Sequence, residues 1–164
     1  MNKKSILKDF ALLACGILIG TGIGYAKIAP FLTWLTMSKT GDGMGWYAET
    51  QYYKATIPAA LKAQNEYLAY LAAIERKKPE WNTWSVPWTT EQLLNYDRAI
   101  TYARIAALEG REGRATDAEQ SWLKAEKAAT AIGWKNPSRE HILKIVTAKE
   151  TEFRKSEEKA QPGR

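Results

Sequence analysis

The chain has 164 residues, of which 45% are hydrophobic and 26% charged, and its formal net charge is +6 at pH 7. This length accommodates one compact domain and a short further segment. The excess of positive charge lies at the N-terminus, where residues 1–40 carry a net +4, while residues 41–164 carry interspersed charges that sum to +2. A nearly neutral body excludes the basic surface of a nucleic-acid-binding protein.

Cysteine and histidine each occur once, as Cys15 and His141. A single cysteine excludes an intramolecular disulfide, and this pair of residues provides too few ligands for a metal site of the usual kind. No glycine-rich loop follows a predicted strand, so no phosphate-binding cradle is present. We therefore predict no cofactor.

The N-terminal segment predicts a membrane anchor. Seventeen uncharged residues run from Phe10 to Ala26, which is the short end of a spanning helix. Lys27 interrupts the apolar run, but a lysine near the end of a span can extend its charge towards water. Trp34 is typical of a membrane interface. We assign residues 1–36 to a short cytoplasmic stub and a transmembrane signal anchor.

Two alternatives to an anchor stay open. Gly24-Tyr25-Ala26 has the small-x-small spacing of a signal-peptide cleavage site, which would release a secreted protein. Leu12-Leu13-Ala14-Cys15 resembles a bacterial lipobox, although the apolar run continues well past the cysteine.

The orientation of the anchor follows from its flanking lysines. Lys3, Lys4 and Lys8 precede the span closely, whereas Lys27 and Lys39 follow it more sparsely. This bias predicts an inner-membrane protein with its N-terminus inside and its C-terminal domain outside, in the periplasm of a Gram-negative cell.

Three glycines of the predicted anchor, Gly16, Gly20 and Gly24, recur at every fourth residue and share one helix face. A face of small residues allows two helices to approach closely in lipid. It predicts a contact with another membrane protein or with a second copy of this chain.

Beyond the anchor, we predict a flexible linker over residues 37–45, because the segment combines three glycines with polar residues. Residues 46–155 form a predicted helical domain, and residues 156–164 a frayed, charged tail.

Helical periodicity dominates the domain, and no strand pattern appears. A first short helix is predicted to end before Thr56, and Pro58 suits the first turn of the next, which we expect to end at Pro79. Three further helices follow, separated by turns near Gly113 and Gly133. The predicted fold class is all-α, a transmembrane helix followed by a bundle of four to five helices.

One motif resembles a known family. Residues 113–125 contain a glycine, two alanines and a tryptophan at the spacing found in the centre of a tetratricopeptide repeat: Gly113, Ala118, Trp122 and Ala125. The resemblance covers residues 99–132 and implies an αα-hairpin that packs through these residues and binds a protein partner. Glu109 and Thr130 depart from the family pattern, and an ordinary αα-hairpin would need the same small and aromatic residues.

Three tryptophans, Trp81, Trp84 and Trp88, cluster in an irregular segment. They either plug the end of the bundle or form an exposed aromatic platform for a sugar or peptide.

Nothing in the sequence indicates catalysis. His141 fits an exposed position in the first turn of the last helix, and carboxylate pairs such as Asp97 with Glu109 cannot be assigned to a site. We predict a non-enzymatic, membrane-anchored module for protein–protein interaction that scaffolds an envelope complex or assists its assembly. The alternative is a ligand-binding module that uses Trp81, Trp84 and Trp88 on a sugar or envelope polymer.

The glycine face gives a test of the anchor. Gly20→Ile should separate the two helices without lowering hydrophobicity, so a reporter of transmembrane association should lose its signal. Ile19→Leu, about 100° around the helix from Gly20, should keep it. Equal signals from the two variants would show that the glycine spacing has no structural role.

Overall fold

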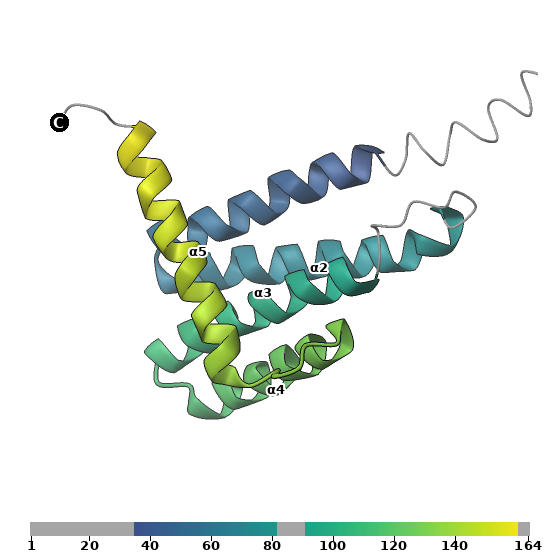
Figure 1. The fold of residues 1–164 in the computed structure, drawn as a ribbon. Helices are drawn as coiled ribbons and strands as arrows, with labels where there is room; N and C mark the ends of the chain where they lie inside the picture. Colours follow the sequence, from purple (N-terminus) through teal and green to yellow (C-terminus); the bar gives the residue numbers. More distant parts are fainter. Residues whose placement is uncertain (1–34, 82–90, 161–164) are drawn as a thin grey trace, which may run out of the picture.

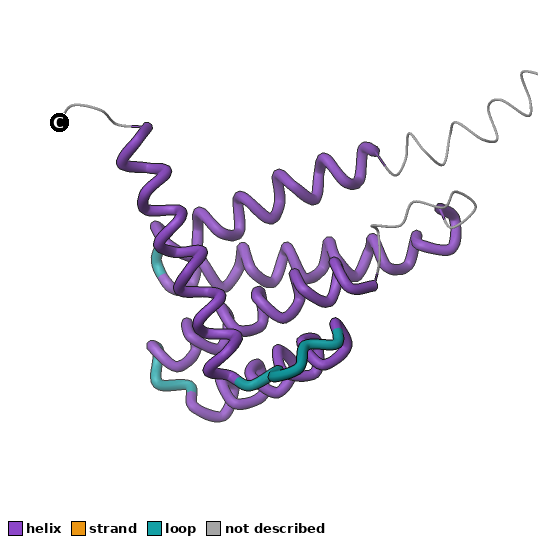
Figure 2. The backbone as a smooth tube through the Cα atoms, viewed as in Figure 1, coloured by secondary structure: helices purple, strands orange, loops and turns teal. Residues whose placement is uncertain are grey.

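The computed structural model describes residues 35–81 and 91–160, and this part of the chain is entirely helical (Figures 1 and 2). A first helix covers residues 35–54 and is called here the 35–54 helix. It is followed by α2 (Ile57–Trp81), α3 (Glu91–Arg111), α4 (Ala115–Ile132) and α5 (Arg139–Ala160). No strand occurs in the described ranges. The predicted all-α class is confirmed.

The helices form two consecutive hairpins with a fifth helix across them. Gly45 lies against Tyr67 and Gly41 against Tyr70, so the 35–54 helix and α2 are antiparallel neighbours. The next pair, α3 and α4, packs along its length, and α2 packs on α3. Figure 1 shows the first four helices side by side, with α5 crossing α3 and α4 at one end. The main core lies between α3, α4 and α5 and reaches Tyr52 and Ala60 of the first hairpin.

The predicted flexible linker over residues 37–45 is wrong, because these residues belong to the 35–54 helix. A Cβ atom at Gly41 would lie 3.1 Å from Cε1 of Tyr70, and one at Gly45 would lie 3.1 Å from the Tyr67 hydroxyl. The glycines therefore let two tyrosines of α2 lie against the helix backbone. Their role is close packing, where the sequence suggested flexibility.

The turn between α3 and α4 is fixed by Gly113, whose φ is +76°. The Arg114 amide donates to the Glu109 carbonyl (2.9 Å) and the Gly113 amide to the Gly110 carbonyl (3.1 Å). These two bonds define a Schellman motif, which needs a left-handed residue and so favours glycine. Gly133 (φ +85°) ends α4 in the same way.

Inside this hairpin, Ala118 and Ala125 are buried, and Trp122 is half-buried at its side. The Arg139 guanidinium lies over the Trp122 ring, 5.8 Å from its centre. The small side chains of Ala118 and Ala125 let α3 and α4 approach closely, while Trp122 covers the edge of the core. A helical hairpin is thus present at residues 99–132.

Two helix ends differ from the sequence-based expectation. α2 continues through Pro79 to Trp81, and α5 continues to Ala160 and so includes part of the predicted frayed tail over 156–164. Near this end of α5, the ring centres of Phe153 and Tyr53 lie 4.8 Å apart, and Glu157 pairs with Lys54. These contacts connect the last turns of α5 to the 35–54 helix.

Among the described helices, none combines the length and apolar character that a membrane span requires. The anchor predicted over residues 1–36 lies almost wholly outside the described residues, and so do its three glycines, Gly16, Gly20 and Gly24. The anchor therefore stays a prediction.

The glycines of the 35–54 helix offer a matched comparison. Gly43 has open space around it, so Gly43→Ala should raise the free energy of unfolding by about 0.5–1 kcal/mol through helix propensity. Gly45→Ala should gain less or lose stability, because its Cβ would crowd the buried Tyr67 ring. Chemical denaturation followed by circular dichroism measures both. Equal gains for the two variants would contradict the proposed role of Gly45.

Candidate functional site

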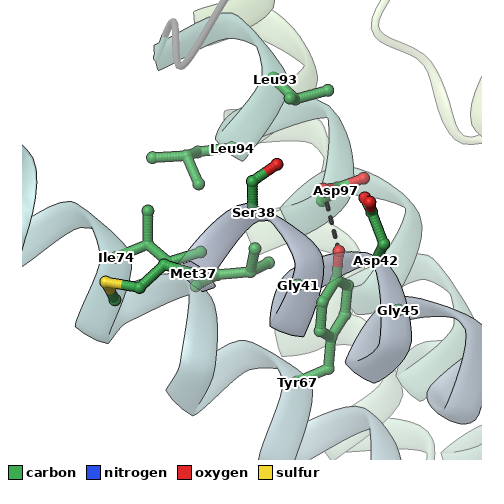
Figure 3. A pocket seen from close by; sticks show the side chains of 11 residues that line it. Met37, Ser38, Gly41, Asp42, Gly45, Tyr67, Ile74, Leu93, Leu94 and Asp97 are labelled. Atoms are coloured by element: carbon green, nitrogen blue, oxygen red, sulfur yellow. Dashed lines mark hydrogen bonds between the residues drawn. The ribbon is translucent and has the colours of Figure 1, made fainter. Parts of the chain in front are cut away.

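The most distinctive site is a cavity of about 310 Å³ between the 35–54 helix, α2 and α3, called here the three-helix cavity (Figure 3). Its volume falls at the lower end of the range for small-ligand pockets. Figure 3 shows apolar side chains on one side and oxygen atoms on the other. The lining consists of Met37, Ser38, Gly41, Asp42, Gly45, Tyr67, Leu71, Ile74, Leu93, Leu94 and Asp97.

The polar side of the cavity is built around a tyrosine–aspartate pair. The Tyr67 hydroxyl of α2 donates a hydrogen bond of 2.9 Å to the Asp97 carboxylate of α3. Tyr67 is only 8% exposed, and burial raises its pKa, with a further rise caused by the negative Asp97. The hydroxyl therefore stays protonated and acts as a donor.

Asp97 is held in a less polar environment than an ordinary surface aspartate. Burial raises the pKa of its carboxyl, while the hydrogen bond from Tyr67 and the positive charge of Lys149 oppose this rise. The negative charge of Asp42, on the 35–54 helix, raises the Asp97 pKa further. Three helices thus bring a tyrosine and two carboxylates to one side of the cavity.

A smaller polar chamber of about 90 Å³ lies on the other side of this pair and shares Gly45, Tyr67 and Asp97 with the cavity. Arg104 of α3 lines the chamber, is 5% exposed and forms an ion pair with Glu49. Its Nε has no hydrogen-bond partner within the described part of the chain. The chamber is also lined by Tyr96, Ile100, Thr101 and Lys149.

A third depression, called here the Trp46 groove, lies between the 35–54 helix and α5. It measures about 270 Å³ and is lined by Trp46, Glu49, Lys149, Glu152, Phe153 and Ser156. Trp46 is 65% exposed, and its neighbour Tyr47 is exposed as well. A largely exposed tryptophan beside a groove is typical of an interaction surface.

The predicted site residues lie elsewhere. Trp84 and Trp88, and the side chain of Trp81, fall outside the described residues. Gly113, Ala118, Trp122 and Ala125 belong to the α3–α4 hairpin and do not reach the cavity. The structure does not bring together Asp97 and Glu109, because Glu109 accepts a hydrogen bond from Ser121 (2.7 Å) inside the hairpin.

His141 is exposed in the first turn of α5 and meets the Trp134 ring edge-on at 5.4 Å. Its backbone N–H lies 3.4 Å from the Ser138 hydroxyl, which caps the helix start. In the described ranges, no group of three or more His, Cys, Asp or Glu side chains is placed to hold a metal ion. The cavity lining contains a serine hydroxyl, Ser38, but no histidine.

Sequence reasoning missed Tyr67 and Asp97 as a site. Tyr67 precedes Leu71 by four residues on the apolar face of α2, a spacing that predicts its burial but gives no information about the partner of its hydroxyl. Asp97 follows Leu93 by four residues and precedes Ile100 by three, so it lies within the apolar stripe of α3. An acidic residue on a buried stripe was the available signal.

The raised pKa of Asp97 predicts a pH dependence. The folded protein binds this proton more readily than the unfolded chain does, so the contribution of Asp97 to stability is present below about pH 4 and is lost as the pH rises through its folded pKa. Asp97→Asn removes the titration. Its free energy of unfolding, relative to the unmodified protein, should therefore rise between pH 4 and pH 7 in urea titrations.

Asp117→Asn is the control, because it removes an exposed carboxylate that is paired with Arg114, and it should not reproduce the rise expected for Asp97→Asn. A constant difference between Asp97→Asn and the unmodified protein across this range would contradict the prediction.

The chain was compared with protein-family models, curated proteins and solved structures, and none of these comparisons yields a match. The resemblance of residues 99–132 to a tetratricopeptide repeat therefore stays a prediction.

Proposed function

We propose that this chain is a membrane-anchored helical interaction module that scaffolds an envelope complex or assists its assembly. The N-terminal segment holds it in the inner membrane, and the helical domain binds a protein partner outside the cytoplasm. It acts by binding and is not an enzyme.

The observation that carries this proposal is the Trp46 groove. Exposed tryptophans next to a depression supply much of the binding energy in protein interfaces, because they bury a large apolar area with few rotatable bonds. Trp46 projects from the 35–54 helix, and Phe153 lines the groove from α5. A partner that covers this side chain would remove a large apolar area from water, which favours association.

The charges beside the groove favour a protein over a polyanion. Lys149 is positive, while Glu49 and Glu152 are negative, and Glu49 is already paired with the buried Arg104. A mixed rim around an aromatic centre matches the composition of protein–protein interfaces. A nucleic acid would need a surplus of positive charge here.

The succession of helices gives independent support. Two helical hairpins that pack on one another present a surface made by both, and helical repeat proteins bind their partners through surfaces of this kind. The resemblance of residues 99–132 to a tetratricopeptide repeat implies the same use.

The test is an affinity purification from detergent-solubilised membranes with the tagged full-length chain. Trp46→Ala should reduce the recovery of a specific partner about tenfold or more, since an interface tryptophan typically contributes 2 kcal/mol or more, at about 1.4 kcal/mol per tenfold. Leu123→Ala removes another exposed apolar side chain, on α4, and should leave recovery unchanged. Equal losses for the two variants, or no loss for either, would refute the role of the groove.

The alternative function, sugar or envelope-polymer binding by Trp81, Trp84 and Trp88, depends on side chains outside the described residues and stays a prediction.

A further inference from the structure

The three-helix cavity combines two surfaces that a single kind of small molecule would satisfy. Leu71 is almost fully buried, and Met37, Ile74 and Leu94 join it to form an apolar wall. The opposite side carries the Asp97 carboxylate and the Tyr67 hydroxyl, as Figure 3 shows. An occupant therefore needs an apolar body and one polar end.

The charge of that polar end follows from the carboxylates. Asp97 and Asp42 line the cavity from α3 and from the 35–54 helix, and no lysine or arginine is among the described lining residues. Burial disfavours the ionised Asp97 carboxylate, while the Tyr67 hydrogen bond and the positive charges of Lys149 and Arg104 favour it. Lys149 and Arg104 line the neighbouring chamber and not this cavity, so they do not contact an occupant of the cavity. A neutral apolar molecule would strip water from the carboxylate charge without replacing it, which is unfavourable. A cationic end would compensate it.

The geometry excludes a divalent metal as the preferred cation. Mg²⁺ and Ca²⁺ require six or more oxygen ligands in a compact shell. Here Asp97 already accepts the Tyr67 hydrogen bond, and most of the remaining lining is hydrocarbon. An ammonium group needs only a few acceptors, and its attached carbon atoms suit the apolar wall.

We propose that the three-helix cavity is a binding site for a small apolar molecule that carries one protonated amino group. The ammonium lies against the Asp97 carboxylate, with Asp42 adding negative potential from the 35–54 helix. The hydrocarbon part packs on Leu71, Ile74 and Leu94. This site is separate from the Trp46 groove and does not depend on the function proposed for it.

The size of the cavity favours a small molecule over a polypeptide. A volume of about 310 Å³ accommodates a ring or a short chain and is too small for a helix of a partner protein. A lysine side chain from a partner also carries an ammonium, so the experiment must separate these two sources.

The test uses three small probes with the full-length chain in detergent micelles, followed by fluorine NMR. 4-Fluorobenzylammonium should bind with a dissociation constant of about 1 mM, as expected for a molecule of this size. 4-Fluorobenzyl alcohol has a similar shape but no charge, and 4-fluorobenzoate carries a negative charge. We expect affinity to fall about tenfold for the alcohol and further for the benzoate, since a charge-assisted hydrogen bond is lost.

Two variants locate the binding. Asp97→Asn should lower the affinity for the amine about tenfold and abolish its advantage over the alcohol. Ser38→Phe should fill the cavity and remove binding of both probes without touching either carboxylate. Asp117→Asn, on the exposed start of α4, is the matched control and should bind like the unmodified chain. Circular dichroism melts verify that each variant is folded.

Several outcomes would overturn the proposal. Equal affinity of the unmodified chain for the amine and the alcohol would overturn it. So would the absence of detectable binding at an amine concentration of about ten times the expected dissociation constant. Unchanged amine affinity in folded Asp97→Asn would exclude the carboxylate. Tighter binding of Nα-acetyl-lysine amide than of the benzylammonium would show that the cavity takes a lysine side chain of a protein.

Discussion

A charge buried in α3 determines where the 35–54 helix lies. The Arg104 side chain of α3 faces this helix, where it pairs with Glu49 and lies over the rings of Tyr52 and Tyr53. A buried guanidinium without its carboxylate would destabilise the fold by about 3–5 kcal/mol, so the helix that supplies Glu49 is held in one position. That position places Asp42 opposite α2 and α3 and thereby creates the third wall of the cavity.

Much of the fold could be predicted because its determinants are local. The left-handed glycines that end α3 and α4, and the apolar spacing of α4, depend on residues close in sequence. The 35–54 helix shows where local reasoning fails. Glycine within a few residues of another glycine normally indicates a flexible segment, and only the tyrosines of α2, more than twenty residues away, reveal Gly41 and Gly45 as packing positions. Pro79 was likewise expected to end α2, which continues to Trp81.

The candidate site was harder to predict than the fold, because it exists only where three helices meet. Tyr67 and Asp97 are thirty residues apart, and the spacing of Tyr67 along α2 indicates a core position but no polar partner. Glu109 illustrates the same difficulty: it departs from the repeat pattern, yet Ser121 across the hairpin satisfies it. A sequence indicates that a polar residue lies on a buried face, but not which partner meets it. The sequence does not indicate that Trp46 is exposed, because an aromatic residue on an amphipathic helix usually points inward.

Tyr67 and Tyr70 of α2 pack against Gly45 and Gly41, so the residue size at each glycine position depends on the side chain that faces it. Tyr67 lies so close to Gly45, and Tyr70 to Gly41, that a Cβ atom at either glycine would come within 3.1 Å of its tyrosine. In evolutionary terms, we expect each glycine and its tyrosine to change together. In a related chain with alanine or serine at the position of Gly45, we expect the Tyr67 ring to shift by a few tenths of an ångström or to be replaced by a smaller side chain, and either change alters the hydrogen bond to Asp97. Gly43 faces open space, so we expect other residues to be tolerated at this position.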